Sequence, residues 1–222
     1  MSSSFIVLTP PSQEPVSLTE VKDWLNIDFP DKDTLLAYLI TRARRYCETV
    51  THRAFATQTI QQVYTVERPS GGELSGPINR GPDWYAYQQM IGANPFGAAQ
   101  FYLDLVMPPF QSGQTYTIET KVTAFDTWKT FPQVTNPDGS TNTYVDNVQE
   151  PARLFFMDPL TVNFWRMTYT TGYWSGYSLD TMAPDLKQCL FELIAAWYDN
   201  REGEGDISDV TSRLLARRVD WV

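Results

Sequence analysis

The stretch DKDTLLAYLITRARRYCETVTHRAF, residues 31–55, contains the clearest periodic pattern in the chain. Its apolar residues recur at 3.6-residue spacing, which is typical of a helix with one buried face: Leu35, Leu36, Leu39, Ile40, Ala43, Cys47 and Val50. Asp31 or Asp33 can cap the start, and the pattern stops near His52. We therefore predict a long amphipathic helix over residues 34–51.

The segment before this helix predicts an arm and a short helix. Residues 1–14 contain serines and prolines and are expected to form an extended N-terminal arm. Ser17 and Glu20 have the spacing of a capping box, which satisfies backbone N–H groups at a helix start. The short helix should cover residues 18–26, because Pro30 prevents its continuation.

A third helix is predicted near the C-terminus. Pro184 and Asp185 suit a first helical turn, since proline lacks the N–H that is unpaired there and an acid complements the helix dipole. The segment that follows is apolar on two sides and stops at Gly203. We expect a helix over residues 185–202 that packs on the helix of residues 34–51.

The middle of the chain has the composition of strands. Runs rich in β-branched and aromatic residues predict strands near residues 59–67, 101–107, 115–125, 143–146, 152–156 and 164–169. The expected fold class is therefore α+β: mainly a helical bundle, with a small antiparallel β-region from residues 59–170, in a single domain over residues 1–222.

Residues 68–100 form a long loop insertion in this scheme. They contain six of the chain's 12 glycines and four of its 15 prolines, and they show no periodicity. Loops of this length are usually functional or mobile. Four aromatic residues distinguish the segment from a plain linker: Trp84, Tyr85, Tyr87 and Phe96.

Composition limits the classes of function. The net charge of −9 argues against a grip on nucleic acid or on anionic lipid, both of which need a basic surface. The longest early apolar run, residues 5–8, is too short for a signal peptide or a membrane span. Cys47 and Cys189 are expected to be buried free thiols, although a disulfide is formally possible.

The sequence offers no pattern for catalysis or for a cofactor. His52 is the only histidine, so the sequence gives little support for a zinc site or for a Ser-His-Asp catalytic arrangement. No phosphate-binding glycine motif occurs. Four aspartates lie close together without the spacing of a calcium loop and are read as helix-capping acids: Asp23, Asp28, Asp31 and Asp33. We therefore expect no metal, no cofactor and no catalytic residue.

One basic cluster lies on the long helix and just after it: Arg42, Arg44, Arg45 and Arg53. A solvated helix face or ion pairs between subunits are its ordinary roles. Direct contact with DNA is the alternative.

Five stretches, in their order along the chain, resemble the head–tail connector (adaptor, or head-completion) family of long-tailed bacteriophages and phage-like particles. They are PVSL at 15–18 with Val21, Lys22 and Leu25; the Asp-rich helix start leading to YCE at 46–48; MPPF at 107–110; YTTGY at 169–173 followed by Pro184; and WYDNRE at 197–202. The resemblance covers roughly residues 15–60 and 100–218 and departs from the family at residues 68–100.

This resemblance implies a structural protein. Such proteins assemble as a ring, usually a dodecamer, below the portal, where the ring extends the DNA channel and joins capsid to tail. The implied partners are the portal protein and a stopper or tail-terminator protein, while DNA passes through without specific binding. The implied location is the virion neck after assembly in the host cytoplasm, with no cofactor and no membrane.

The resemblance also implies a role for residues 207–222. After the break at residues 202–206, a short helix over residues 207–218 is expected to detach and dock on the portal through Ile207, Val210, Leu214, Leu215, Arg217 and Trp221. The alternative is a last helix that folds back on its own domain. The aromatic residues Trp84, Tyr85, Tyr87 and Phe96 of the insertion are expected to contact a neighbouring subunit or another neck or capsid protein.

Two other functions compete with the connector ring. One is another neck or tail component, a stopper or a tail terminator, which would differ in its neighbours within a particle. The other is a carboxylate-based enzyme, which would show a cleft with two close carboxylates of raised pKa.

Overall fold

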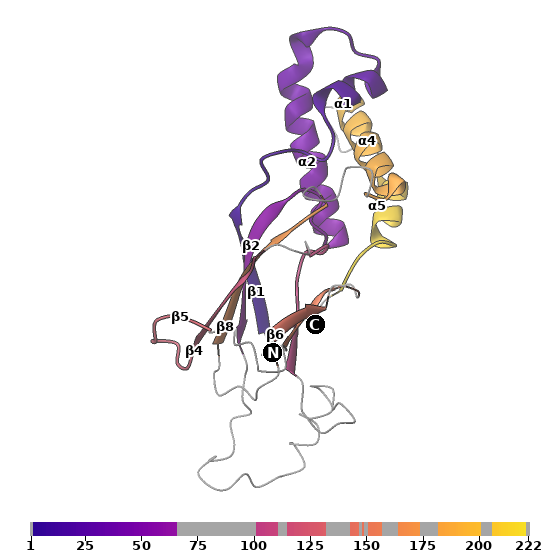
Figure 1. Ribbon diagram of the computed structural model, residues 1–222. Helices are drawn as coiled ribbons and strands as arrows, with labels where there is room; N and C mark the ends of the chain where they lie inside the picture. The colour runs from indigo at the N-terminus through magenta and orange to yellow at the C-terminus, as the bar shows by residue number, and fades with distance from the viewer. Residues whose placement is uncertain are drawn as a thin grey trace, which may run out of the picture.

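The computed structural model describes residues 2–65, 101–110, 115–131, 143–146, 148, 151–156, 164–173, 182–200 and 206–220. Its helices gather at one end of an elongated molecule, and the strands extend from them toward the other end (Figure 1). The α+β class is confirmed. The expectation of a mainly helical bundle was overstated, because the described part contains eight strands in two antiparallel sheets beside the helices.

The predicted helices all form, with ends that differ by a few residues from the prediction. They are α1 (Leu18–Leu25), α2 (Asp33–Thr51), α4 (Pro184–Asp199) and α5 (Ser208–Leu215), with a 3-10 turn at Pro30–Lys32. The capping box at the start of α1 is confirmed, since the Ser17 hydroxyl accepts from the Glu20 N–H and the Glu20 carboxylate accepts from the Ser17 N–H. The helix α2 ends at His52, which has a left-handed backbone with φ 55°.

The five-stranded sheet has the order β1-β2-β8-β4-β5, and the three-stranded sheet has the order β3-β7-β6. The strands are β1 (Ser2–Thr9), β2 (Gln58–Thr65), β3 (Phe101–Asp104), β4 (Thr117–Lys121), β5 (Lys129–Thr130), β6 (Thr143–Asp146), β7 (Arg153–Phe156) and β8 (Phe164–Thr171). On β2 and β8 every second residue is buried, so one face of these strands covers a core and the other meets solvent.

The predicted N-terminal arm is part of the larger sheet. Strand β1 pairs antiparallel with β2 from Ser2 opposite Thr65 to Val7 opposite Ile60. It is extended as expected, and its β-branched and aromatic run explains why it forms a strand instead of a free arm. Among the described strands, β1 stands at the edge of the sheet.

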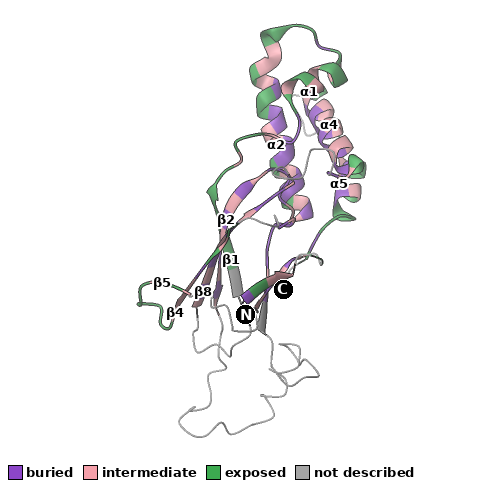
Figure 2. Cartoon of the chain, viewed as in Figure 1, coloured by how far each residue is buried: buried purple, intermediate pink, exposed green. Residues whose placement is uncertain are grey.

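Two hydrophobic clusters hold the molecule together (Figure 2). The first, here called the helical core, lies among the four helices and includes Val21, Leu36, Leu39, Ile40, Ala43, Leu186, Leu190, Leu193, Val210 and Leu214. The second, the sheet core, is built from both sheets and includes Ile60, Leu103, Ile118, Leu154, Trp165, Met167 and Tyr169. The chain must therefore pass between two separate cores.

The first passage follows α2. Ala54 enters the sheet core and the next residue, Phe55, enters the helical core. The return passage follows β8 at Gly172, whose φ is +115°; a Cβ there would lie 2.3 Å from the Ala56 carbonyl oxygen. Only glycine fits this close approach of the two passages. The Gly172 N–H donates to the Pro109 carbonyl at 3.0 Å, so a third segment joins the same junction.

The two cysteines are free and buried, as expected. Cys47 lies on α2 and Cys189 on α4, and both contribute to the helical core. Burial raises the pKa of the Cys47 thiol well above its ordinary value and also raises that of Cys189. Thiolate is the reactive form, so both thiols are protected from alkylation and oxidation.

The last helix packs on its own domain in this structure, which is the alternative to a detached docking element that the sequence left open. Helix α5 packs against both α2 and α4, and Val210 and Leu214 are buried in the helical core. The Val219 N–H donates to the Thr51 carbonyl at 3.0 Å, which fastens the chain beyond α5 to the end of α2. The glycines and acids of residues 202–206 were read as a joint, but the apolar stripe of α5 is satisfied within the same chain.

Substituting neighbouring leucines in α5 will test this packing. Leu214→Ala should lower the free energy of unfolding by about 2–5 kcal/mol, because Leu214 is fully buried. Leu215→Ala is the matched control: this side chain is 49% exposed, so the change should stay within about 0.5 kcal/mol. Urea unfolding followed by circular dichroism measures both. Equal stability of the two variants would show that α5 contributes nothing to the fold.

Candidate interaction surfaces

The structure divides the six residues predicted to dock on the portal. Val210 and Leu214 are buried and Ile207 is half-buried, all three against the helical core. Leu215 and Arg217 are exposed. Trp221 lies outside the described residues. The buried members serve the fold, so Leu215 and Arg217 are the described members of this set that a partner can reach.

Polar contacts fix α5 in place around its buried stripe. Tyr46 on α2 and Thr211 on α5 share a hydrogen bond of 2.8 Å between their hydroxyls. Arg213 forms an ion pair with Glu192 on α4. Arg217 forms another with Asp185 at the start of α4, at 2.8 Å, between side chains that are about half exposed. Exposed ion pairs of this kind contribute little stability, so Arg217 can exchange its partner at low cost.

The predicted contacts of the loop insertion, Trp84, Tyr85, Tyr87 and Phe96, lie outside the described residues, as do all of residues 68–100.

The four arginines of the basic cluster do not form one solvated face. Arg45 is exposed, whereas the Arg42 guanidinium lies 4.1 Å from the centre of the Trp197 ring. The Arg53 Nε–H donates to the Arg217 carbonyl at 2.8 Å. Arg44 is buried. A single solvated face is therefore not formed: Arg42, Arg44 and Arg53 are held by contacts within the chain.

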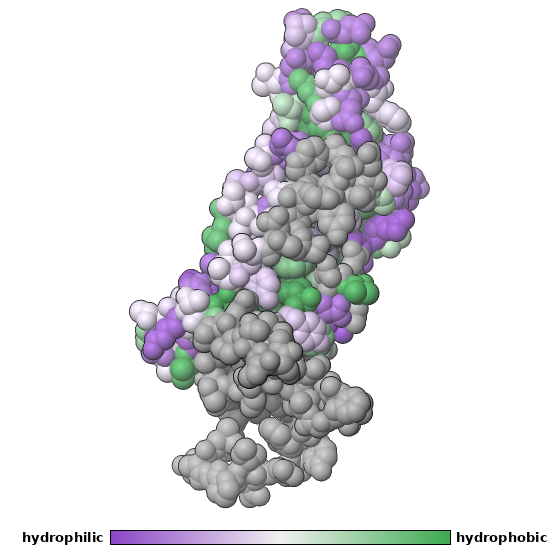
Figure 3. All heavy atoms as spheres, in the orientation of Figure 1, coloured by the Kyte–Doolittle hydropathy of each residue, from purple (hydrophilic) through white to green (hydrophobic). Residues whose placement is uncertain are grey.

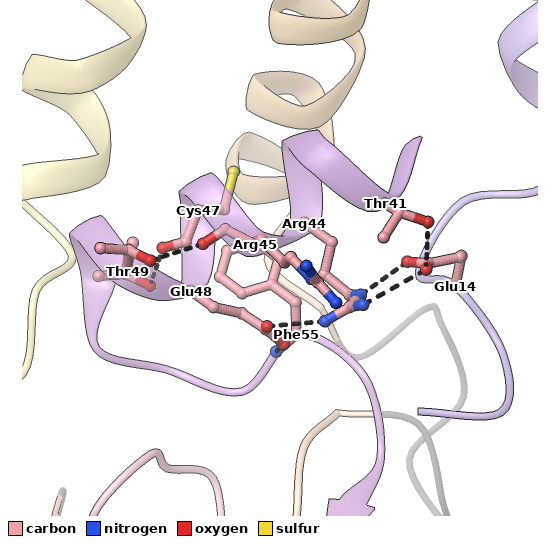
Figure 4. Close-up of polar contacts among 9 residues, drawn as sticks. Glu14, Thr41, Arg44, Arg45, Cys47, Glu48, Thr49 and Phe55 are labelled. Carbon is pink, nitrogen blue, oxygen red and sulfur yellow. Dashed lines mark hydrogen bonds and ion pairs between the residues drawn. The ribbon is translucent and has the colours of Figure 1, made fainter. Parts of the chain in front are cut away.

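Arg44 lies at the centre of a polar network near the junction of the two halves (Figure 4). Its Nε–H donates to Glu14 at 2.7 Å, and its Nη1 donates to Glu48 at 2.8 Å. The other Glu48 oxygen accepts from the Phe55 backbone N–H at 3.0 Å. The Thr41 hydroxyl donates to Glu14 at 2.9 Å. The network thus joins the segment before α1, the helix α2 and the passage into β2.

Burial of this network shifts the ionisation of its members. Burial raises the pKa of the Glu48 carboxyl above its ordinary value, although Arg44 and the Phe55 N–H lower it in part. Burial also disfavours the Arg44 cation, but the bond to Glu14 and the charge of Glu48 outweigh this and raise the pKa of Arg44. Arg44 therefore favours the charged form of Glu48 and opposes the effect of burial on its pKa.

The described part of the chain lacks a cluster of metal-binding side chains. It contains no group of three or more histidine, cysteine, aspartate or glutamate side chains that would hold a metal ion. Burial raises the pKa of Tyr64 and Tyr169 well above the ordinary value, but both hydroxyls serve the sheet core. The Tyr169 hydroxyl donates to Gln62 at 2.8 Å. Among the described helices, none is long and apolar enough to cross a membrane.

Apolar side chains reach the surface at both edges of the five-stranded sheet. On β1, four consecutive residues are 39–57% exposed: Phe5, Ile6, Val7 and Leu8. At the opposite edge the turn between β4 and β5 protrudes from the molecule (Figure 3) and exposes Val122 at 51% and Phe125 at 99%. Sequence analysis missed both features as interaction sites. A run of apolar residues without a charged neighbour was the signal on β1.

Residues 15–72 match the family model described as "Phage gp6-like head-tail connector protein". The resemblance to head–tail connectors is confirmed. The match begins at the capping-box segment, contains α1 and α2 in full and continues past the end of β2. Glu48 and Phe55, which direct the chain out of α2, lie within it. The family is one of structural connectors and not of enzymes.

Chains of solved gene transfer agent (GTA) particles share the fold of this protein. A chain from the neck of an empty GTA particle, computed with C6 symmetry, matches with a TM-score of 0.60 and 16% identity over 100% of this chain and 97% of that one. A chain from the virion of a native gene transfer agent (GTA) particle matches with a TM-score of 0.58 and 16% identity over 98% and 96%.

A third chain, from the neck of a native GTA particle computed with C12 symmetry, matches with a TM-score of 0.52 and 17% identity over 100% and 97%. At these identities the likeness establishes a shared fold. No curated protein matches this chain.

Removing the buried cation tests the polar network around Arg44 and Glu48. Arg44→Met should lower the free energy of unfolding at neutral pH by about 3–5 kcal/mol, because Glu48 then becomes a buried charge without its cation. The pKa of Glu48 in the folded state, already raised, should rise further. Protonated Glu48 is the tolerated form, so the lost stability should return as pH falls through that raised value.

The control for this experiment is Glu48→Gln. It keeps an acceptor for the Phe55 N–H and leaves Arg44 paired with Glu14, so it should cost less than Arg44→Met at neutral pH. The double variant should lack the pH dependence. Urea unfolding at neutral and mildly acidic pH, with the wild-type profile subtracted, measures all three. A pH-independent cost of Arg44→Met would contradict the assignment.

Proposed function

We propose that this protein is a head-to-tail adaptor of a phage or phage-like particle: a ring of copies below the portal that extends the DNA channel and joins capsid to tail. The ring is a structural part of the virion neck. It uses no cofactor and catalyses no reaction.

One observation carries the proposal: the fold matches chains from GTA necks along the whole of both partners. Coverage of 100% and 97% means that the helical half and the sheet half occur together in those chains, in the same order. A family match limited to α1 and α2 would support a shared helical module only. The two findings agree on the same kind of particle and the same part of it.

Copy number and charge fit a channel that DNA passes without sticking. The matching necks were computed with C6 and C12 symmetry, which favours a ring of twelve copies here as well. Twelve copies at −9 each would carry −108 in total. A wall of this sign repels phosphates, so DNA slides past it. Specific contact with DNA has no part in the proposal.

Docking on the portal is assigned to the accessible part of the C-terminal segment. Leu215 and Arg217 face outward while their neighbours anchor α5 to the helical core, so the segment is presented on a firm base. Trp221 and the aromatic residues of the insertion stay in the proposal as contacts with portal and with neighbouring neck proteins. Each contact is small, and repetition around a ring makes the attachment firm.

The proposed function predicts where the protein is found. In particles made with an epitope-tagged chain, the tag should map to the neck, between portal and tail. Particles made without the chain should accumulate as DNA-filled heads with tails unattached. Electron microscopy of both preparations measures the outcome. A tag at the tail tip, or normal particles without the chain, would refute the proposal.

If Leu215 belongs to the docking surface, a substitution there should weaken portal binding without changing the stability of the fold. Leu215→Glu should leave the urea midpoint nearly unchanged, because the side chain is half exposed, and should abolish co-purification with the portal. Ala37→Glu is the matched control, since it adds the same charge at an exposed position of α2. Retention of portal by Leu215→Glu, or its loss with Ala37→Glu, would move the docking site away from α5.

A further inference from the structure

The turn between β4 and β5 is a well-formed structure that exposes a large aromatic side chain. The Thr123 N–H donates to the Asp126 carboxylate at 2.7 Å, and the Asp126 N–H donates to the Thr123 carbonyl at 3.3 Å. The Lys121 ammonium donates to the Ala124 carbonyl at 3.0 Å. These bonds span Phe125, which is 99% exposed. A rigid turn that holds an aromatic group in solvent is already shaped for a partner.

The side chains behind this turn hold it in position relative to the sheet. Arg166 on β8 pairs with Glu119 on β4 through two bonds of 2.7 and 2.8 Å. The Arg166 guanidinium also lies 4.5 Å from the centre of the Trp128 ring, which precedes β5. The Lys121 ammonium lies 4.9 Å from the same ring. The cations stacked on Trp128 therefore hold the base of the hairpin in place. Because the hairpin is already ordered, its tip should lose little conformational entropy when it binds a partner.

The opposite edge of the same sheet offers a suitable receiving surface. Strand β1 lies at the edge of the sheet among the described strands, and it exposes four consecutive apolar residues, 5–8. Residues 1–13 contain no charged side chain, so charge does not protect this edge strand from association; its pairing with β2 is irregular only between Val7 and Thr9. An edge of this kind is a natural interface for a further β-element.

The two surfaces lie at opposite edges of one sheet. This arrangement favours another copy of the same chain as the partner. A contact between different surfaces of identical chains is heterologous, and it generates a closed ring when the rotation between copies closes. A contact of β1 with another β1 would stop at two copies. Charge agrees: residues 117–131 contain two lysines and two acids, and β1 contains none. These surfaces can meet without the repulsion that a net charge of −9 imposes elsewhere.

We propose that the β4–β5 hairpin of each copy packs on the β1 edge of the next copy, with Phe125 lying against Phe5–Leu8. The occupant of the β1 edge is thus a second copy of this chain. This interface rests on the proposed ring and specifies which surfaces close it.

Cross-linking between single-cysteine additions tests the interface. Ile6→Cys and Phe125→Cys place reactive thiols at two exposed positions, whereas Cys47 and Cys189 are buried and serve as the unreactive background. The two variants are mixed, assembled into particles and treated with a short bis-maleimide. Along the sheet, four strand spacings separate β1 from β5, about 19 Å, so a short reagent cannot bridge the edges of one copy.

The expected result is a covalent dimer in the mixture and a ladder of larger products from the double variant Ile6→Cys/Phe125→Cys. Val148→Cys mixed with Ile6→Cys is the matched control and should give no product, although Val148 is 90% exposed. Dimers from Ile6→Cys alone would overturn the proposal in favour of a two-fold β1 contact. Absence of products in particles whose neck ring is visible would overturn the interface alone. Absence of the chain from the neck would overturn the proposed function.

Discussion

The carboxylate of Glu48 is the constraint on which the two-part architecture depends. It binds Arg44 one turn earlier on α2 and accepts the N–H of Phe55, the residue at which the chain has left the helix. This fixes the direction of the chain just where Ala54 must enter one core and Phe55 the other. Arg44 extends the restraint to Glu14, before the capping box of α1. A buried ion pair is seldom retained for stability alone, because desolvation offsets its attraction; here its geometry specifies the exit from the helix.

The junction around this network connects three segments that are distant in sequence. The passage at Ala56, the return at Gly172 and the Pro108-Pro109 segment contact one another through backbone groups, with the Ala54 N–H donating to the Pro108 carbonyl at 2.9 Å. Backbone contacts leave no room for side chains to adapt, so the two halves are held in one orientation. In the proposed ring this would keep the proposed docking surface on α5 and the sheet edges in one fixed relation in every copy.

Local sequence patterns were sufficient to predict the helices, but they were not sufficient to predict how segments distant in sequence pack together. The 3.6-residue stripe of α2 and the Ser17 capping box depend on neighbours within one or two turns, and both were predicted correctly. The roles of Arg44 and α5 depend on partners far away: Glu14 is 30 residues from Arg44, and Thr51 binds the chain at Val219. The sequence alone does not distinguish an arginine that binds two acids from one that faces solvent. From the sequence alone, the apolar stripe of α5 could pack on a partner protein or on the chain's own helices.

Electrostatics explains why surfaces low in charge should hold such a ring together. Copies with a charge of −9 repel one another over roughly 10 Å at moderate ionic strength, so close approach is least costly where each chain presents no net charge. Strand β1 and the β4–β5 hairpin meet that condition, and the exposed acids of α1 and α4 do not. Screening by salt then favours association of the copies, whereas it weakens any protein that holds DNA through phosphate contacts. In the proposed ring, the acidic composition that leaves DNA free to move would thus also favour subunit contacts at apolar edges of low charge.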